Sequence, residues 1–309
     1  MPALPIMIDC DPGVDDAIAL LLALSSPELE VLGITTVAGN VAMEHIQRNA
    51  RQICELAGRP DMKVFAGCPR PLIHPLQTAE EIHGAGGLAG MTLPAPTMSL
   101  QSQHGVDFLI ETLENAATPI TLATLGPLTN VAIALIKAPH IATKIERLVL
   151  MGGSTTFGNI TASSEFNIYV DPHAAHVVFT SSVPLTMIGL NVTHTVMSTP
   201  TRRDRLRACS KVGAIAAQML DFYGAEEAEQ LGLPGPPLHD PCVIAYLIQP
   251  DLFTGQAVRV DVEIASPLTL GRTVVDFNPT EEPNATVITQ ANADGFYELL
   301  TQRLGQLGA

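Results

Sequence analysis

The sequence contains no tryptophan, and aromatic residues make up only 4% of its 309 positions. Positive charge is also scarce, because 16 Lys and Arg stand against 31 Asp and Glu and give a formal net charge of −15. A field of that sign repels phosphate backbones and anionic lipid headgroups, so nucleic acids and membrane surfaces are poor partners. Cations and uncharged small molecules meet no such barrier.

Cysteine is sparse, and its spacing suggests neither disulfides nor zinc. The five cysteines are scattered, and none forms a CxxC pair. The first residues, MPALPIMIDCDPG, lack the basic region and the long apolar segment of a signal peptide. Every apolar run is interrupted well before the roughly 18 residues that a membrane-spanning helix needs. We therefore expect a reduced, soluble, cytoplasmic protein.

Hydrophobic residues are abundant, at 47% of the chain, and they occur in short runs that alternate with helix-length segments. The runs rich in Val, Ile and Leu predict buried strands at residues 5–9, 29–37, 64–67, 120–125, 147–151 and 183–190. Helices are predicted between them at residues 16–24, 43–57, 105–116, 128–136 and 172–181. This alternation is typical of an α/β protein with an open, mostly parallel, Rossmann-like sheet and helices on both faces.

The pattern changes after residue 201. A long helix is expected at residues 203–222, followed by the Gly- and Pro-rich stretch GLPGPPLHDPC and a helix that ends at residue 248. Residues 258–264, 272–277 and 285–289 predict late strands that form a small C-terminal antiparallel addition, before a last helix at residues 293–304. No linker or repeat divides the chain, so we predict a single domain over residues 1–309.

Four carboxylates follow the first predicted strand in DCDPGVDDA, namely Asp9, Asp11, Asp15 and Asp16. In open parallel sheets, ligands bind in the crevice beyond the carboxyl ends of the strands. Helix capping explains one or two acids at this position but not four, which repel one another unless a cation or bound protons compensate. Hard oxygen ligands favour calcium or magnesium over zinc. The sequence therefore predicts a metal site here.

A metal-dependent phosphatase is an alternative, because Asp9 and Asp11 have the DxD spacing of an aspartate nucleophile after a first strand. That chemistry requires a Ser or Thr shortly after the pair, where PGV stands, and cationic groups to hold phosphate, which are few here. The phosphatase therefore remains the weaker hypothesis.

Further polar groups follow other predicted strands. Asn40 ends TVAGN, and the carbonyl of Leu125 in LGPLTN points out of a strand end, where it offers a neutral oxygen ligand. His83 lies in IHGAGGLAG, whose four glycines allow movement over a cleft. Taken singly, Asn40 is an ordinary turn residue and His83 an ordinary surface histidine.

The loop GNITASSEFN brings together Asn159, Glu165 and Asn167, whose amide and carboxylate groups suit recognition of several hydroxyls. Two Asp-Pro pairs follow along the chain. Asp171 is predicted to cap a helix that begins at the next residue. Asp240 has the same signature, but His239 before it and a flexible Pro/Gly run favour a place in the site.

These motifs together resemble one family. DCDPGVDDA, TVAGN, IHG, GPLTN, LVLMGG, SEFNIYVDP and HDPC occur in this order and at these spacings in the inosine-uridine-type nucleoside hydrolases, and the resemblance covers nearly the whole chain. It implies a calcium-dependent N-ribohydrolase that cleaves ribonucleosides to ribose and free base in nucleoside salvage. The expected partners are a small-molecule ribonucleoside and further copies of the chain in a dimer or tetramer.

The resemblance also implies a ligand set for calcium. Asp11, Asp16 and Asp240 correspond to the family's carboxylate ligands, and the Leu125 carbonyl corresponds to a further one. The family usually has Thr at the position of Leu125, a change that a main-chain ligand tolerates. Asp11 also matches the residue that takes the proton from the attacking water.

Sugar recognition is implied by four more residues, and a fifth lines the site beside them. Asp15 and Asn167 match the ligands of the 2′- and 3′-hydroxyls, while Asn159 and Glu165 match the groups that hold the 5′-hydroxyl. Asn40 lines the side of the site from which water attacks. Carboxylates around the ring favour the positive charge that develops on ribose as the N-glycosidic bond breaks.

Nucleobase contacts are implied for His83 and His239, the latter as the acid or hydrogen-bond donor that assists the leaving base. Tyr223 and Glu227 are four residues apart, so we expect them to share a helix face near the substrate. A surface helix end explains that pair equally well. The expected specificity leans slightly to pyrimidines or mixed use, and a non-catalytic nucleoside sensor is a third hypothesis.

Overall fold

The computed structural model describes residues 2–230 and 232–308, apart from the side chains of residues 226, 227 and 230. Within them, nine strands form one sheet in the order β3 (Val64–Ala66), β2 (Leu29–Thr36), β1 (Leu4–Cys10), β4 (Ile120–Thr124), β5 (Ile145–Met151), β6 (Leu185–Ile188), β9 (Ala285–Ala291), β7 (Phe253–Val262) and β8 (Thr273–Asp276). From β3 to β9 all neighbours are parallel. The predicted α/β architecture is confirmed.

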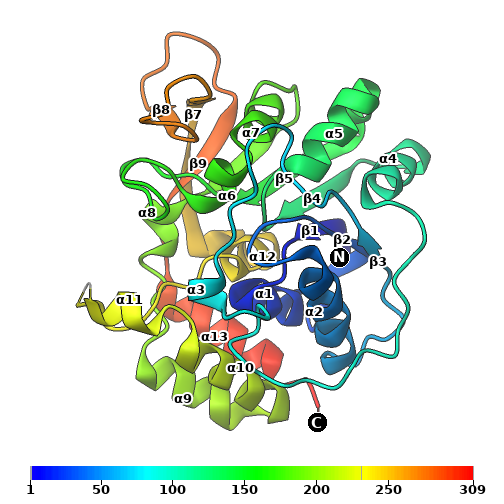
Figure 1. Ribbon diagram of the computed structural model, residues 1–309, viewed down its shortest axis with the longest axis vertical. Coiled ribbons are helices and arrows are strands. Elements are labelled where there is room, and N and C mark those ends of the chain that lie inside the picture. The colour runs from blue at the N-terminus through cyan, green and yellow to red at the C-terminus, as the bar shows by residue number, and fades with distance from the viewer. Residues whose placement is uncertain (1, 231, 309) are drawn as a thin grey trace.

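Helices cover both faces of this sheet (Figure 1). One face carries α4 (Gly105–Asn115), α5 (Thr129–Lys137) and α7 (Pro172–Phe179), and the other carries α1 (Val14–Leu24), α2 (Met43–Leu56) and α12 (Pro241–Ile248). Along β1, Ile6 and Ile8 join one hydrophobic cluster while Met7 joins another. Because successive side chains of a strand point to opposite faces, this strand is apolar throughout rather than alternating.

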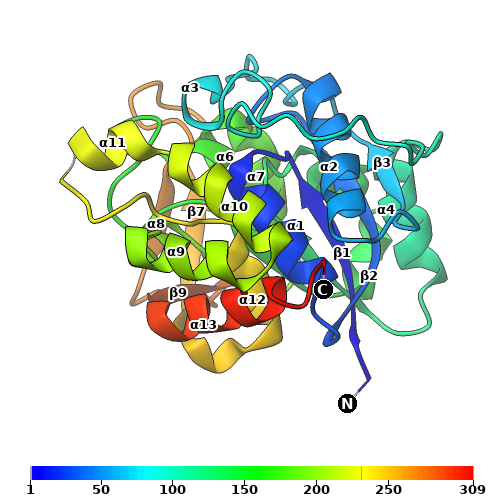
Figure 2. The ribbon, with the colours of Figure 1, turned by 90° about the horizontal axis from the view of Figure 1, so that it is seen from below.

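Shorter helices lie in the connections between the longer elements. They are α3 (Glu80–His83), α6 (Phe166–Val170), α8 (Leu190–Thr193) and α11 (Ala225–Gln230). Figure 2 shows α3, α6 and α11 at the end of the molecule away from the N-terminus. The chain leaves β1 for β2 and β3 on one side and returns to β4 on the other. The β1 and β4 ends therefore form the switch point where ligands bind in such sheets.

The single helix predicted at residues 203–222 is wrong. The segment forms α9 (Pro200–Cys209) and α10 (Lys211–Phe222), and Ser210 between them has extended backbone angles. The Ser210 hydroxyl accepts from the Gly213 amide at 2.9 Å and donates to the Leu304 carbonyl at 2.7 Å, at the end of α13 (Ala293–Leu304). A cap and a tertiary contact thus interrupt a helix that local propensity continues.

The late strands are placed differently from the prediction in one respect. β7 pairs antiparallel with β8 and β9, as expected, but β9 lies parallel to β6 and so extends the main sheet. The β8 residue Thr273 is bound to the loop after β5: its hydroxyl donates to the Ser154 carbonyl at 2.7 Å and accepts from the Ser154 amide at 2.9 Å. The C-terminal strands therefore support a loop near the strand ends.

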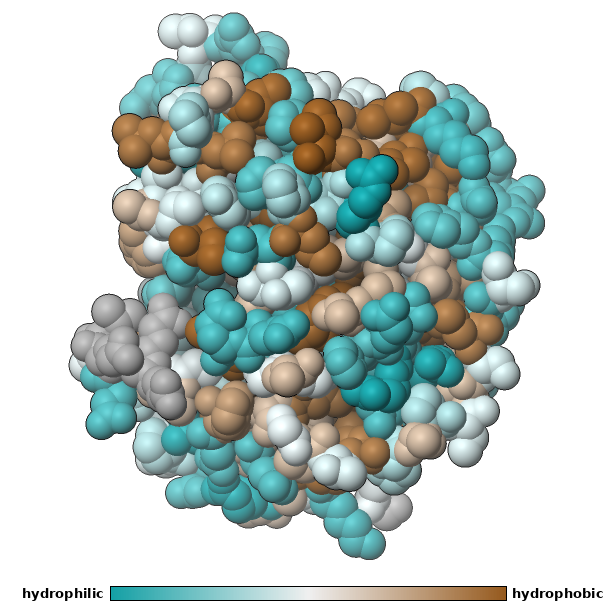
Figure 3. All heavy atoms as spheres, viewed as in Figure 1, coloured by the Kyte–Doolittle hydropathy of each residue, from teal (hydrophilic) through white to brown (hydrophobic). Residues whose placement is uncertain are grey.

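The surface is mixed in polarity. Hydrophobic patches alternate with hydrophilic side chains on the face seen in Figure 3, and exposed large apolar residues such as Ile73 and Leu268 lie on loops. Across the described residues, every helix is too short or too polar to cross a lipid bilayer.

Asp171 is a structural residue, as predicted. It is fully buried, and its Oδ1 accepts from the Ala174 amide at 3.0 Å as the N-cap of α7. Its Oδ2 accepts from the Leu72 amide at 2.8 Å and the Thr129 hydroxyl at 2.7 Å. One carboxylate thus ties α7 to the start of α5 and to a distant loop.

Replacing Asp171 with Ala should lower the free energy of unfolding by about 2–4 kcal/mol, because a cap is lost and buried donors are left without an acceptor. Urea unfolding of the purified variant measures this loss. Asp294→Ala is the control, since Asp294 is an acid in the first turn of a helix with a side chain that is 95% exposed. Equal stability of the two variants would contradict the assignment.

Candidate active site

The turn between β1 and α1 is held by Asp16. Its carboxylate accepts from the Asp11 amide at 3.1 Å and from the Gly13 amide at 3.0 Å, so it closes the turn and caps the helix. Gly13 is required here for space, because a Cβ at this position would lie 2.4 Å from Nδ1 of His83 and 2.9 Å from the Asn40 amide. The DPG turn therefore allows side chains from two other segments to approach α1.

Asn40 joins the end of β2 to this turn. Its side-chain amide donates to the Asp11 carbonyl and to Oδ2 of Asp16, both at 3.1 Å, and its backbone amide donates to Oδ2 of Asp11 at 2.7 Å. Glycines crowd the same carboxylate, since a Cβ at Gly39 or Gly126 would lie 1.9 or 2.3 Å from an Asp11 oxygen. Asn40 is thus a structural part of the acidic cluster and more than a turn residue.

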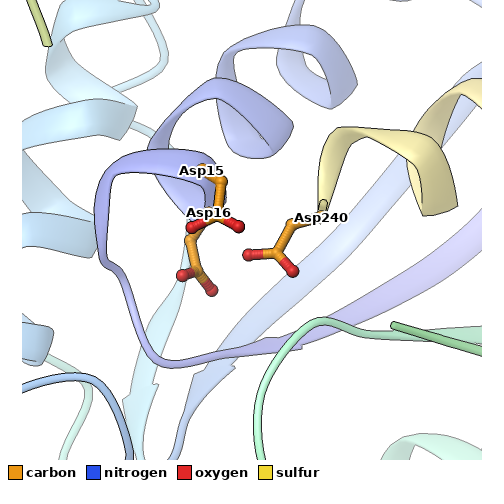
Figure 4. A group of neighbouring side chains, drawn as sticks. All are labelled: Asp15, Asp16 and Asp240. Carbon is orange, nitrogen blue, oxygen red and sulfur yellow. The ribbon is translucent and has the colours of Figure 1, made fainter. Parts of the chain in front are cut away.

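Asp240 completes the cluster from α12. Unlike Asp171, it makes no side-chain cap bond, so its carboxylate is available to the site. Figure 4 shows Asp15, Asp16 and Asp240 converging from the starts of α1 and α12, and one ligand oxygen from each lies within 4.8 Å of the others. The predicted ligands Asp16 and Asp240 are therefore adjacent, with Asp15 as their third neighbour.

The electrostatics of this cluster fit a cation. Burial, followed by repulsion between neighbouring carboxylates, raises the pKa of Asp16 to about 7 and holds the pKa of Asp11 and of Asp240 well above the ordinary value. Oδ1 of Asp11 is buried and has no hydrogen-bond partner among the described residues. Hard oxygen donors, unbalanced charge and an unpartnered buried oxygen together suit a divalent metal ion.

Three of the predicted hydroxyl ligands, Asn159, Glu165 and Asn167, lie in the loop after β5 and at the start of α6. Glu165 caps α6 by accepting from the Asn167 amide at 3.0 Å, and its other oxygen accepts from the Gly153 amide at 2.9 Å. Burial raises the pKa of Glu165 to about 7. The side-chain amide of Asn167 donates to the Leu125 carbonyl at 2.7 Å, and Oδ1 of Asn159 accepts from the Phe166 backbone amide at 2.9 Å. Each polar group therefore has a fixed orientation.

His83 is buried at the end of α3 and is not a surface histidine. The Val14 amide donates to its Nδ1 at 3.0 Å. An amide can only donate, so Nε2 of a neutral ring carries the proton. Burial lowers the pKa of His83 to about 4, which keeps the ring neutral. His83 therefore presents a hydrogen-bond donor.

Tyr223 is also buried, and its hydroxyl donates to Oδ2 of Asp15 at 3.1 Å. The shared helix face predicted with Glu227 is wrong, because Tyr223 lies just after α10 as its C-cap and Gly224, with a φ of +56°, turns the chain before α11 begins. The side chain of Glu227 lies outside the described residues. Tyr223 thus contacts the acidic cluster directly, whereas a surface helix end would not.

His239 faces the cluster from the loop before α12. Its Nδ1 lies 2.7 Å from the hydroxyl of Thr193, a residue that the sequence reasoning missed. Burial lowers the pKa of His239 to about 4, against an opposing effect of Asp15. At neutral pH the ring is therefore an uncharged hydrogen-bonding group.

A cavity of about 180 Å³ gathers most of the predicted residues. The site residues predicted from the sequence that line it are Asp15, Asn40, His83, Leu125, Asn159, Glu165, Asn167, Tyr223, His239 and Asp240. Asp11 and Asp16 are fully buried and contact Asn40, which does line it. The prediction did not include the apolar wall, which is formed by Ala79, Ile82, Met151, Ile160, Phe166, Pro236 and Pro237, nor Glu81 and Gly224.

The sequence of this chain matches the profile of a known protein family. The sequence profile described as inosine-uridine preferring nucleoside hydrolase matches residues 6–298. The chain belongs to this family. It is therefore a nucleoside hydrolase, an enzyme that hydrolyses the N-glycosidic bond of ribonucleosides, and the phosphatase and sensor hypotheses are set aside.

The relatives of this nucleoside hydrolase match along its whole length. A pyrimidine-specific ribonucleoside hydrolase RihA of Salmonella gallinarum is 46% identical over 306 residues, which cover 98% of each chain. The structure of a purine-preferring ribonucleoside hydrolase from Gardnerella vaginalis is 35% identical, with a TM-score of 0.91 and coverage of 97% and 98%. A plant nucleoside hydrolase is 32% identical, with a TM-score of 0.93 and coverage of 99% and 100%.

Gly13→Ala should reduce kcat/KM for uridine by about 100-fold, because the new methyl group displaces His83 and Asn40 and misplaced site groups cost roughly this much. Steady-state kinetics measures the loss, and circular dichroism checks that the variant folds. Gly86→Ala is the matched control, since a Cβ there would lie 3.9 Å from its nearest neighbour, the Arg48 guanidinium. If both variants retain full activity, the close approach at Gly13 has no role in the site.

Proposed function

We propose that this nucleoside hydrolase prefers pyrimidine ribonucleosides, uses calcium, and acts in nucleoside salvage. The observation that carries the proposal is the convergence of buried carboxylates from α1 and α12 at a cavity that also contains amides and two histidines. We assign Asp11, Asp16, Asp240 and the Leu125 carbonyl as the residues that hold the ion. Asp15 is close enough to Asp16 and Asp240 to be a further ligand of the ion.

When bound, calcium would bind the two ring hydroxyls of ribose and lower the pKa of a water molecule beside it. Asp11 would then take the proton of the water molecule that attacks the anomeric carbon, as a general base. This role requires an ionised carboxylate, and a neighbouring divalent charge lowers the pKa of buried acids such as Asp11. The fixed geometry of Asp11, imposed by the Asn40 amide, directs it without a further rearrangement.

The sugar would be held from two sides. We assign Asp15 and Asn167 to its 2′- and 3′-hydroxyls, and Asn159 and Glu165 to its 5′-hydroxyl. Asn167 is kept in place by donating to the Leu125 carbonyl, which couples its position to a proposed ion ligand. The surrounding carboxylates stabilise positive charge on the ribose ring as the bond to the base lengthens.

The nucleobase would meet hydrogen-bond donors. With Nδ1 occupied by the Val14 amide, His83 offers Nε2–H to an acceptor such as a pyrimidine carbonyl. We assign His239 as a neutral donor that stabilises the departing base, rather than as a protonated acid, because burial lowers its pKa to about 4. The pyrimidine preference draws support from the greater identity to the RihA hydrolase than to the purine-preferring structure.

We further propose a cytoplasmic location, in keeping with five cysteines that form no disulfide. Assembly as a dimer or tetramer stays a prediction, which sedimentation of the purified protein tests.

Calcium should raise the melting temperature of EDTA-treated protein by several degrees, since an ion that binds only the folded state stabilises it. The shift should be lost in Asp240→Asn, which keeps the side-chain shape but removes a charged ligand. Asp251→Asn, at an exposed position, should keep it. Differential scanning fluorimetry over a calcium titration makes the comparison, and a full shift in Asp240→Asn would remove Asp240 from the ligand set.

Uridine should have a kcat/KM at least about 100-fold above that of 2′-deoxyuridine, because a site built around a hydroxyl leaves buried polar groups unpaired when that hydroxyl is missing. Reducing-sugar release measures both substrates, with inosine included to test base preference. The 5′-deoxy analogue serves as the control for the other side of the sugar. Comparable turnover of uridine and 2′-deoxyuridine would disprove diol recognition, and faster turnover of inosine would disprove the pyrimidine preference.

A further inference from the structure

A buried threonine that does not line the cavity contacts His239. Thr193 ends α8, the short helix that follows β6, so it lies at the same sheet edge as the other site residues. Its side chain is fully buried, and its hydroxyl oxygen lies 2.7 Å from Nδ1 of His239. The proposed mechanism gives Thr193 no role, although polar groups are seldom buried without one.

The backbone around this contact is fixed on both sides. The Thr193 amide donates to the Gly189 carbonyl at 3.1 Å, and its carbonyl accepts from the Val196 amide at 2.9 Å. The Leu238 amide, next to His239, donates in turn to the Val196 carbonyl at 3.0 Å. The two residues are therefore held in register by main-chain bonds that do not depend on their side chains.

The direction of the bond follows from the hydroxyl's surroundings. Among the described residues, His239 is the one hydrogen-bond partner of the Thr193 side chain. If Nδ1 carried the proton, the buried hydroxyl hydrogen would have no acceptor, at a cost of about 1–3 kcal/mol. If the hydroxyl donates to Nδ1, both the hydroxyl and Nδ1 are satisfied. The second arrangement is favoured, and it leaves the proton of the neutral ring on Nε2.

The neighbouring ring of His194 does not determine which nitrogen of His239 carries the proton. Its centroid lies 5.6 Å from that of His239 at a tilt of 53°, a packing contact that restricts rotation of the ring. Packing alone does not distinguish the two nitrogens, which differ in hydrogen bonding and little in shape. The tautomer therefore depends on the Thr193 hydroxyl.

We infer that Thr193 is a positioning residue, which holds His239 in the Nε2–H tautomer so that the ring donates to the departing nucleobase. This inference rests on the proposed role of His239 in leaving-group stabilisation. A hydroxyl that donates at Nδ1 also polarises the ring, and it keeps Nε2–H facing the cavity through the reaction. Loss of the hydroxyl should therefore weaken assistance to poor leaving groups and spare good ones.

The test compares Thr193→Val, which preserves shape but removes the hydroxyl, with Thr193→Ser, which keeps it. We expect Thr193→Val to lower kcat for uridine by at least about tenfold, in the range usual for residues that orient a reacting group. The same variant should keep kcat for p-nitrophenyl riboside within about threefold, because that leaving group needs no donor. Thr193→Ser should restore most of the activity on uridine.

A spectroscopic measurement separates positioning from a general loss of structure. In protein with ¹⁵N-labelled histidine, the ring nitrogens of His239 should report the Nε2–H tautomer in the native enzyme and in Thr193→Ser. In Thr193→Val the signal should shift toward the Nδ1–H form. Native ring shifts in Thr193→Val would overturn the inference, and so would an equal loss of activity on both substrates.

His239→Ala distinguishes failure of this inference from failure of the proposed function. If His239→Ala slows uridine and p-nitrophenyl riboside equally, leaving-group stabilisation by His239 is wrong, and the inference falls with it. If His239→Ala is selective but Thr193→Val is not, the positioning role alone is wrong. Combining both substitutions should add nothing to the effect of His239→Ala, since Thr193 acts only through that ring.

Discussion

Repulsion between desolvated carboxylates is the constraint on which the site depends. Asp11, Asp15, Asp16 and Asp240 are all buried, and burial raises the pKa of each. The protein offsets part of this cost with backbone amides of the β1–α1 turn and with the Asn40 amide. The repulsion that remains would be relieved when a cation and a substrate bind, so the unbound site is an energetically unfavourable part of the fold.

Much of the fold and the position of the site could be predicted from the sequence, because strand ends are easy to locate. Runs of Val, Ile and Leu mark the parallel strands, and polar groups directly after them converge whatever the details of packing. The two Asp-Pro pairs, at Asp171 and Asp240, show that the same local sequence can serve a helix cap or the site. Both precede proline at a helix start, yet of the two only Asp171 makes the cap bond, while Asp240 lines the cavity beside His239.

What could not be predicted depends on contacts between distant segments. The orientation of His83 is set by the Val14 amide, and the break at Ser210 is fixed by the end of α13. Thr193 follows a strand like the other site residues, but a threonine in NVTH carries no signal of its own until His239 is placed against it. Pairwise geometry of this kind is absent from periodicity and composition.

The position of β9 has a consequence for biosynthesis. Leu185 in β6 pairs with Ala285 in β9, and Thr273 in β8 secures the loop after β5. Most of the parallel sheet leaves the ribosome before these partners exist, so the nascent chain presents an open β6 edge until its last strands are made. An unpaired strand edge of this kind is open to pairing with another chain, so it favours aggregation until β9 has been made.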